Sequence, residues 1–196
     1  MRGSFFAALL VVAACTHHGS TVSRDPDSSD LEVYRAVLDS MFTPHAQSKF
    51  SRIAVVDSTE VFKRENASAL IQSLVKVPEV DSAAARDFAT RSYEARSLKG
   101  IAAVRLRMPV LLLDRGALAP LPREDPDKYW TEFYQRFPGT NGLISLSAIG
   151  YNADGNLGVL MVDVGCGSLC GNGYIVVAKR ERGKWYLATI QNTWVS

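Results

Sequence analysis

The sequence has few of the residues from which metal and nucleophile sites are usually built, with 3 Cys and 3 His among 196 residues. Two of the His are adjacent, at His17 and His18 in a polar stretch, and no further ligand follows at a zinc-site spacing. We therefore interpret them as solvated residues and expect no metal ion and no cofactor. His45 has no catalytic partner fixed by spacing.

An excess of charge of one sign is also missing, because 22 Lys and Arg balance 20 Asp and Glu to a net charge of +2. Proteins that bind nucleic acid usually carry a basic stripe, so we expect no nucleic-acid partner. The sequence contains no internal repeat and no low-complexity run. Its glycines match neither the dinucleotide-binding nor the P-loop pattern, so backbone cradling of a phosphate has no support.

The N-terminal apolar run, residues 5–14, has about ten residues and is too short to span a bilayer. It follows a short basic start and ends in Val12-Ala13-Ala14-Cys15, which resembles a bacterial lipobox. That resemblance implies a signal peptide over residues 1–14, cleavage before Cys15, and lipid on its sulfur and on the new amino terminus. Ordinary signal cleavage and a buried apolar N-terminus are the alternatives.

Lipid on Cys15 makes the membrane the first expected partner, and two acyl signals together anchor a protein stably. Because Thr16 rather than Asp follows the Cys, we expect the outer membrane, with the protein facing the periplasm. Residues 15–30 contain almost nothing apolar and predict a flexible tether. Residues 31–196 are long enough to bury a core and predict a single domain.

The first part of this domain predicts helices with strands between them. Leu31, Tyr34, Leu38 and Met41 repeat at helical spacing after the capping-box pattern that begins at Ser29. Further patterns predict a strand at 53–56, helices at 67–75 and 82–98, and a strand at 104–108 in which Arg105 and Arg107 alternate with apolar residues.

An aromatic helix is predicted to begin at Pro126, with Asp125 before it. Its aromatic side chains lie at helical spacing on one face, which favours packing against the sheet over a ligand platform: Trp130, Phe133, Tyr134 and Phe137. We interpret the neighbouring acids Glu124, Asp125 and Asp127 as solvated and capping residues, not as paired catalytic carboxylates.

The last third of the chain is rich in β-branched and aliphatic residues, separated by short polar turns. It predicts an antiparallel meander of four strands at 143–151, 157–164, 174–179 and 185–190. The predicted fold class is α+β, with N-terminal helices packed on a curved, mainly antiparallel sheet. Trp185 and Trp194 are an odd number of residues apart, so we expect them on opposite faces and both at least partly buried.

Cys166 and Cys170 flank a glycine-rich turn between the second and third meander strands. In an exported protein, a pair of cysteines this close predicts a disulfide. A thiol nucleophile, a redox pair or half of a metal site are the alternatives, although two cysteines supply only half a zinc shell.

The C-terminal pattern resembles a family of bacterial exported proteins of unknown activity. The resemblance covers about the last 70 residues and is carried by Gly150-Tyr151-Asn152, by the Cys166-Gly167 and Cys170-Gly171 pairs with Gly173-Tyr174, and by Trp185 with Trp194-Val195-Ser196. It implies the fold and an exported location, and it transfers no catalytic residue.

From these observations we expect a membrane-anchored envelope lipoprotein with a non-enzymatic binding or interaction domain, and we assign no catalytic residue. The alternative is a hydrolase or a thiol-redox enzyme that uses the Cys166–Cys170 loop. The state of the thiols discriminates between the two, since a reactive Cys needs a lowered pKa and access to solvent.

Overall fold

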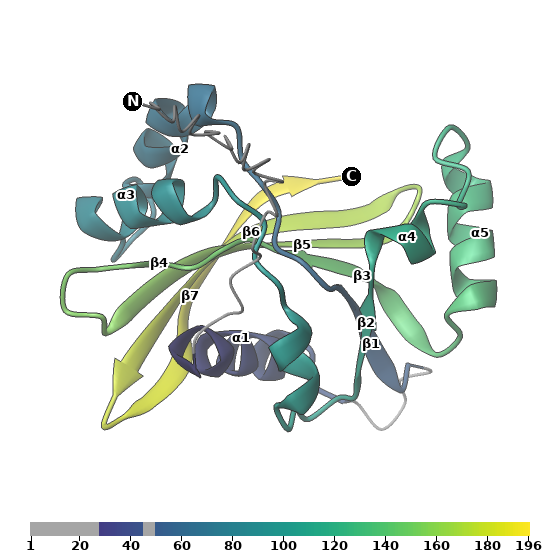
Figure 1. Cartoon of the computed structure of the whole chain (residues 1–196), viewed down its shortest axis with the longest axis horizontal. Helices are drawn as coiled ribbons and strands as arrows, with labels where there is room; N and C mark the ends of the chain where they lie inside the picture. Colours follow the sequence, from purple (N-terminus) through teal and green to yellow (C-terminus); the bar gives the residue numbers. More distant parts are fainter. Residues whose placement is uncertain (1–27, 45–49) are drawn as a thin grey trace, which may run out of the picture.

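The computed structural model describes residues 28–44 and 50–196. Within them five α-helices accompany one mixed sheet of seven strands, and the α+β class predicted from the sequence is confirmed (Figure 1). The helices are α1 (Ser28–Met41), α2 (Ala67–Leu74), α3 (Ser82–Arg91), α4 (Arg115–Leu118) and α5 (Pro126–Arg136). The strands are β1 (Arg52–Val56), β2 (Val110–Leu113), β3 (Thr140–Leu146), β4 (Gly150–Tyr151), β5 (Leu157–Gly167), β6 (Cys170–Glu181) and β7 (Lys184–Val195).

The strand order is β2-β1-β3-β5-β6-β7, and β4 also pairs with β5. The C-terminal strands β5, β6 and β7 form the predicted antiparallel meander. Its expected first strand is divided in two, since β3 and β4 pair with different parts of β5. Strand β1 runs parallel to both β2 and β3, which makes the sheet mixed.

Helices cover both faces of the sheet (Figure 1). Ile53 and Val55 of β1 pack in the cluster that contains the buried side of α1, whereas Ala54 and Val56 pack with Phe133 of α5. Alternate residues of a strand point to opposite faces, so α1 and α5 lie on opposite sides of the sheet. Helices α2 and α3 share the face of α5, because Phe88 packs with the β5 side chains that alternate with those facing α1.

An aspartate begins each of the helices α3 and α5. Asp81 accepts a hydrogen bond from the backbone N–H of Ala84, and Asp125 accepts one from Lys128, each satisfying a free donor of the first helical turn. Pro126 occupies the start of α5, where its missing N–H costs nothing.

Several expected boundaries were wrong. Residues 104–108 form no strand; the backbone N–H of Arg107 is bonded instead to the Asp39 carboxylate, 2.7 Å away. The helix expected over 82–98 ends at Arg91, and Leu98 is buried in the connection that follows. Helix α1 begins at Ser28, so residues 28–30, which we assigned to the tether, belong to the folded domain.

None of the helices in the described ranges combines the length and the hydropathy needed to cross a bilayer.

Candidate functional site

The Cys166–Cys170 loop closes the turn between β5 and β6. A disulfide joins the two residues, whose Cα atoms are 5.0 Å apart, within the usual range for such bonds. The turn residues Ser168 and Leu169 lie at the surface, and the Leu169 side chain is 87% exposed. Cys170 is also exposed, while Cys166 is half-buried. The predicted pairing is confirmed, and the bond lies where solvent reaches it.

Helix α5 holds this loop through a residue near each of its ends. The Tyr134 hydroxyl donates to the Cys166 carbonyl at 2.9 Å, and the Ser168 hydroxyl contacts the Asp127 carboxylate. Asp127 therefore fastens the turn, and its negative charge beside the loop disfavours a thiolate there. The aromatic face of α5 packs as expected, with Phe133 fully buried.

The glycines around the loop admit tryptophan rings. A Cβ atom on Gly165 would lie 2.9 Å from the Trp130 ring, and one on Gly173 would overlap the indole of Trp194. Glycine is therefore required at positions 165 and 173 because a larger side chain would collide with a tryptophan ring.

The two C-terminal tryptophans lie on opposite faces of the sheet, as expected, but differ in how far they are buried. Trp185 and Trp194 lie on opposite faces of the sheet, since their β6 partners Arg180 and Gly173 are an odd number of residues apart. Trp185 is buried among the side chains that face α1, but Trp194 is 43% exposed. Trp194 belongs to β7, the edge strand of the sheet.

Asp163 is a polar site that the sequence reasoning missed. Its carboxylate accepts a hydrogen bond from the Trp194 indole N–H at 3.0 Å, and it lies between Ser145 of β3 and Gly173 of β6. Burial raises the pKa of Asp163 above its usual value, the Trp194 bond lowers it, and the nearby charge of Glu60 raises it. Glu60 in turn pairs with Arg115 at 3.3 Å.

Carboxylates with a raised pKa occur in catalytic sites and also in structural hydrogen-bond networks. The sequence did contain a signal, since Asp163 is the one charged residue in the apolar run 157–164.

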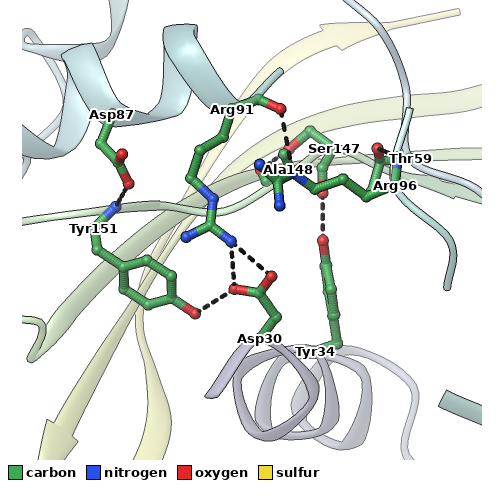
Figure 2. Close-up of polar contacts among 9 residues, drawn as sticks. All are labelled: Asp30, Tyr34, Thr59, Asp87, Arg91, Arg96, Ser147, Ala148 and Tyr151. Atoms are coloured by element: carbon green, nitrogen blue, oxygen red, sulfur yellow. Dashed lines mark hydrogen bonds and ion pairs between the residues drawn. The ribbon is translucent and has the colours of Figure 1, made fainter. Parts of the chain in front are cut away.

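A second polar cluster joins α1, α3 and β4 inside the molecule (Figure 2). Asp30 is 1% exposed, and both of its carboxylate oxygens accept from Nη2 of Arg91, at 2.9 and 2.7 Å. The Tyr151 hydroxyl donates to the same carboxylate at 2.9 Å. Burial, and then the charge of Asp30, strongly raise the pKa of Tyr151.

The neighbouring bonds of this cluster shape the backbone between β3 and β4 (Figure 2). The Tyr34 hydroxyl of α1 donates to the Ser147 carbonyl at 2.8 Å, and the Ser147 hydroxyl accepts from the Met161 N–H at 2.7 Å. The Asp87 carboxylate accepts from the Tyr151 N–H at 2.8 Å. These mutual hydrogen bonds are typical of a structural network. Within the described residues, one donor of the cluster, the buried Nε–H of Arg91, has no acceptor.

Cys15, His17, His18 and His45 lie outside the described residues. Arg105 and Arg107, expected on one face of a strand, lie in an irregular connection. In residues 28–44 and 50–196, no three His, Cys, Asp or Glu side chains are grouped so that they could hold a metal ion.

Comparisons with protein-family models, with curated proteins and with solved structures found no match for this chain.

Proposed function

We propose that this chain is a cell-envelope lipoprotein, held at the outer membrane by lipid on Cys15 and facing the periplasm, with a folded domain that binds a partner and performs no catalysis. The proposal rests first on the lipobox-like stretch 12–15. The structural observation that supports it is the closed Cys166–Cys170 disulfide. Disulfides persist in exported proteins and are rare in reducing compartments.

The setting of that disulfide supports a structural role. The loop is fastened to α5 through Tyr134 and Asp127, and its glycines make room for Trp130 and Trp194. A thiol enzyme would need a positive group beside the loop to stabilise a thiolate, and the two side chains bonded to the loop, Tyr134 and Asp127, supply none.

The anchor is tested by replacing the lipid-bearing residue. Cys15→Ser should move the protein from the membrane to the soluble fraction, because the acyl chains supply the membrane affinity. The double variant Cys166→Ser/Cys170→Ser is the matched control and should stay in the membrane fraction. Equal membrane retention of Cys15→Ser and wild type would contradict the anchor.

The alternative, a hydrolase or thiol-redox enzyme that uses the Cys166–Cys170 loop, is favoured by one observation, the exposure of Cys170. Thiol alkylation of unreduced protein separates the two functions. The binding domain predicts no free thiol at Cys166 or Cys170, and two readily alkylated thiols would favour the redox enzyme.

A further inference from the structure

The two edges of the sheet differ in length and in protection. Strand β2 forms one edge with four residues, and Pro109 before it has no N–H to donate. Strand β7 forms the other edge with twelve residues, and within the described chain it pairs only with β6 (Figure 1). Along an edge strand, alternate residues aim their N–H and C=O groups away from the sheet, where a further strand can pair.

The β7 edge lacks the residues that usually block such pairing. Residues 185–195 contain no charged residue and no proline. Eight large hydrophobic side chains are exposed in the ranges that the structure describes, and four of them are on β7: Tyr186, Ile190, Trp194 and Val195. A long, uncharged edge with exposed apolar side chains is a template for another strand.

Two β-bulges in β7 determine which of its residues share a face. Ala188 and Thr193 are the extra residues, because no β6 residue pairs with them. Ile190 pairs with Val176, which belongs to the core cluster under α1, so Ile190 faces α1 and its two neighbours in the strand face away. The run 189–192 between the bulges is regular.

Counted without the bulged residues, β7 is complementary to itself about Ile190. Thr189 and Gln191 lie one position from Ile190, Tyr186 and Trp194 lie three positions from it, and all four face away from α1. If two copies of β7 run antiparallel about a two-fold axis at Ile190, Thr189 opposes Gln191, and Tyr186 opposes Trp194. Ile190 then opposes its own copy. Polar–polar, aromatic–aromatic and apolar pairs of this kind stabilise antiparallel strands, and no like charges meet.

We propose that β7 is the interface between two copies of this chain, which pair antiparallel about Ile190 and join their sheets into one. Leu187 opposes Asn192 in this register and keeps its apolar contacts within its own copy, where it packs on the α1 cluster. The contact uses the same strand in both copies, so it is closed by the two-fold axis. It leaves β2, which is short and follows Pro109, at both outer edges, and assembly therefore stops at the dimer.

Sedimentation measures the dimer in the unlipidated chain of residues 15–196 with Cys15→Ser. We expect a reversible monomer–dimer equilibrium with a Kd of about 10 µM or tighter. Ile190→Lys should weaken it about tenfold, because two like charges then lie opposite each other at the axis. Val61→Lys is the matched control, because Val61 is 51% exposed, close to the 47% of Ile190, and lies outside the strands.

A cysteine at position 190 tests the register. In the Cys15→Ser background, Ile190→Cys should form a disulfide-linked dimer on mild oxidation, because its Cα atom lies about 4.5–5.5 Å from its copy. Asn192→Cys is the control, since Asn192 is exposed on the same face of β7. Its two copies are offset by four positions along the strands, about 13 Å, which a disulfide cannot bridge.

A chain that stays monomeric at about 100 µM would overturn the proposal and leave the edge to an extended segment of another protein. Oligomers larger than a dimer, or equal weakening by Ile190→Lys and Val61→Lys, would also overturn it. Far-UV circular dichroism equal to that of the parent chain shows that the variants are folded. If Ile190→Lys does not fold, the cross-link decides, and equal cross-linking of Ile190→Cys and Asn192→Cys would refute the pairing.

The inference goes beyond the envelope function proposed above, because it names a second copy of this chain as a partner. Sedimentation of the unlipidated chain involves no membrane. Its failure therefore leaves the fractionation test of Cys15 unaffected, and the anchor and the interface are tested separately.

Discussion

The buried pair of Asp30 and Arg91 offers the sharpest test of how the first helix is held. Asp30→Asn keeps the shape of the side chain and removes its charge, which leaves the Arg91 guanidinium unpaired. Removing one partner of a buried ion pair costs about 3–5 kcal/mol. The Asp30 side chain is 2% exposed and that of Arg91 is 17% exposed, so residual solvation of Arg91 favours the lower end of that range.

A loss of about 3 kcal/mol should lower the melting temperature by about 6–12 °C in a domain of this size. Thermal and urea unfolding followed by circular dichroism measure it. The matched control is Asp39→Asn on the same helix, whose ion-pair partner Arg35 is 56% exposed at 3.9 Å, and it should cost less than about 1 kcal/mol.

A compensating variant removes the whole network. Asp30→Leu, Arg91→Met and Tyr151→Phe together should regain most of the lost stability, since apolar replacement of a complete buried ion pair is often neutral. If Asp30→Asn melts as Asp39→Asn does, the pair does not hold α1 in place and the reasoning is refuted.

Three further predictions concern the disulfide end of the sheet. Cys166→Ser/Cys170→Ser should lose about 2 kcal/mol and melt several degrees lower, with an unchanged far-UV spectrum, because the closed loop is small; a lost spectrum would show that the bond is needed for folding. Gly173→Ala should lower the free energy of unfolding by about 1–3 kcal/mol in the wild-type background, because the added methyl group meets the indole of Trp194. In the Trp194→Ala background the loss should be smaller, and an equal loss in both backgrounds would exclude the contact. Because the pKa of Asp163 is raised in the folded protein, the protonated carboxyl stabilises the fold fully below the ordinary pKa of 3.8, and this contribution is lost as pH rises through the folded pKa. At pH 7, Asp163→Asn should therefore unfold at a higher urea concentration than wild type, and near pH 3 the two should unfold at the same concentration. If the Asn variant is less stable than wild type at pH 7, the carboxylate stabilises the fold.

Local chemistry in the sequence determined much of the sheet and its helix starts. The strands β5 and β6 follow from runs of β-branched and aliphatic residues, and Asp81 and Asp125 cap the helices that they precede. The Cys166–Cys170 pairing also follows, because four residues with a turn between them bring the Cα atoms within reach. Each of these depends on residues close together in the chain.

Other features of the fold depend on contacts between residues that are far apart in the sequence, and only the tertiary structure shows them. The alternation at 104–108 indicated a strand, yet Asp39, 68 residues earlier, binds the backbone N–H of Arg107. The parallel pairing of β1 with β2 and β3 leaves no local signature, since parallel partners are joined by long connections.

The same holds for the charged groups. Asp30 was assigned to a tether because its sequence neighbours are polar, but Arg91, 61 residues later, makes its burial possible. Asp163 was read as part of an apolar strand, and its partner Trp194 is 31 residues away. Hydrophobic periodicity reports which face of one element is apolar. It does not report which charged side chains can be buried. A carboxylate is buried only where another element supplies hydrogen-bond donors, and the packing of the elements determines where that occurs.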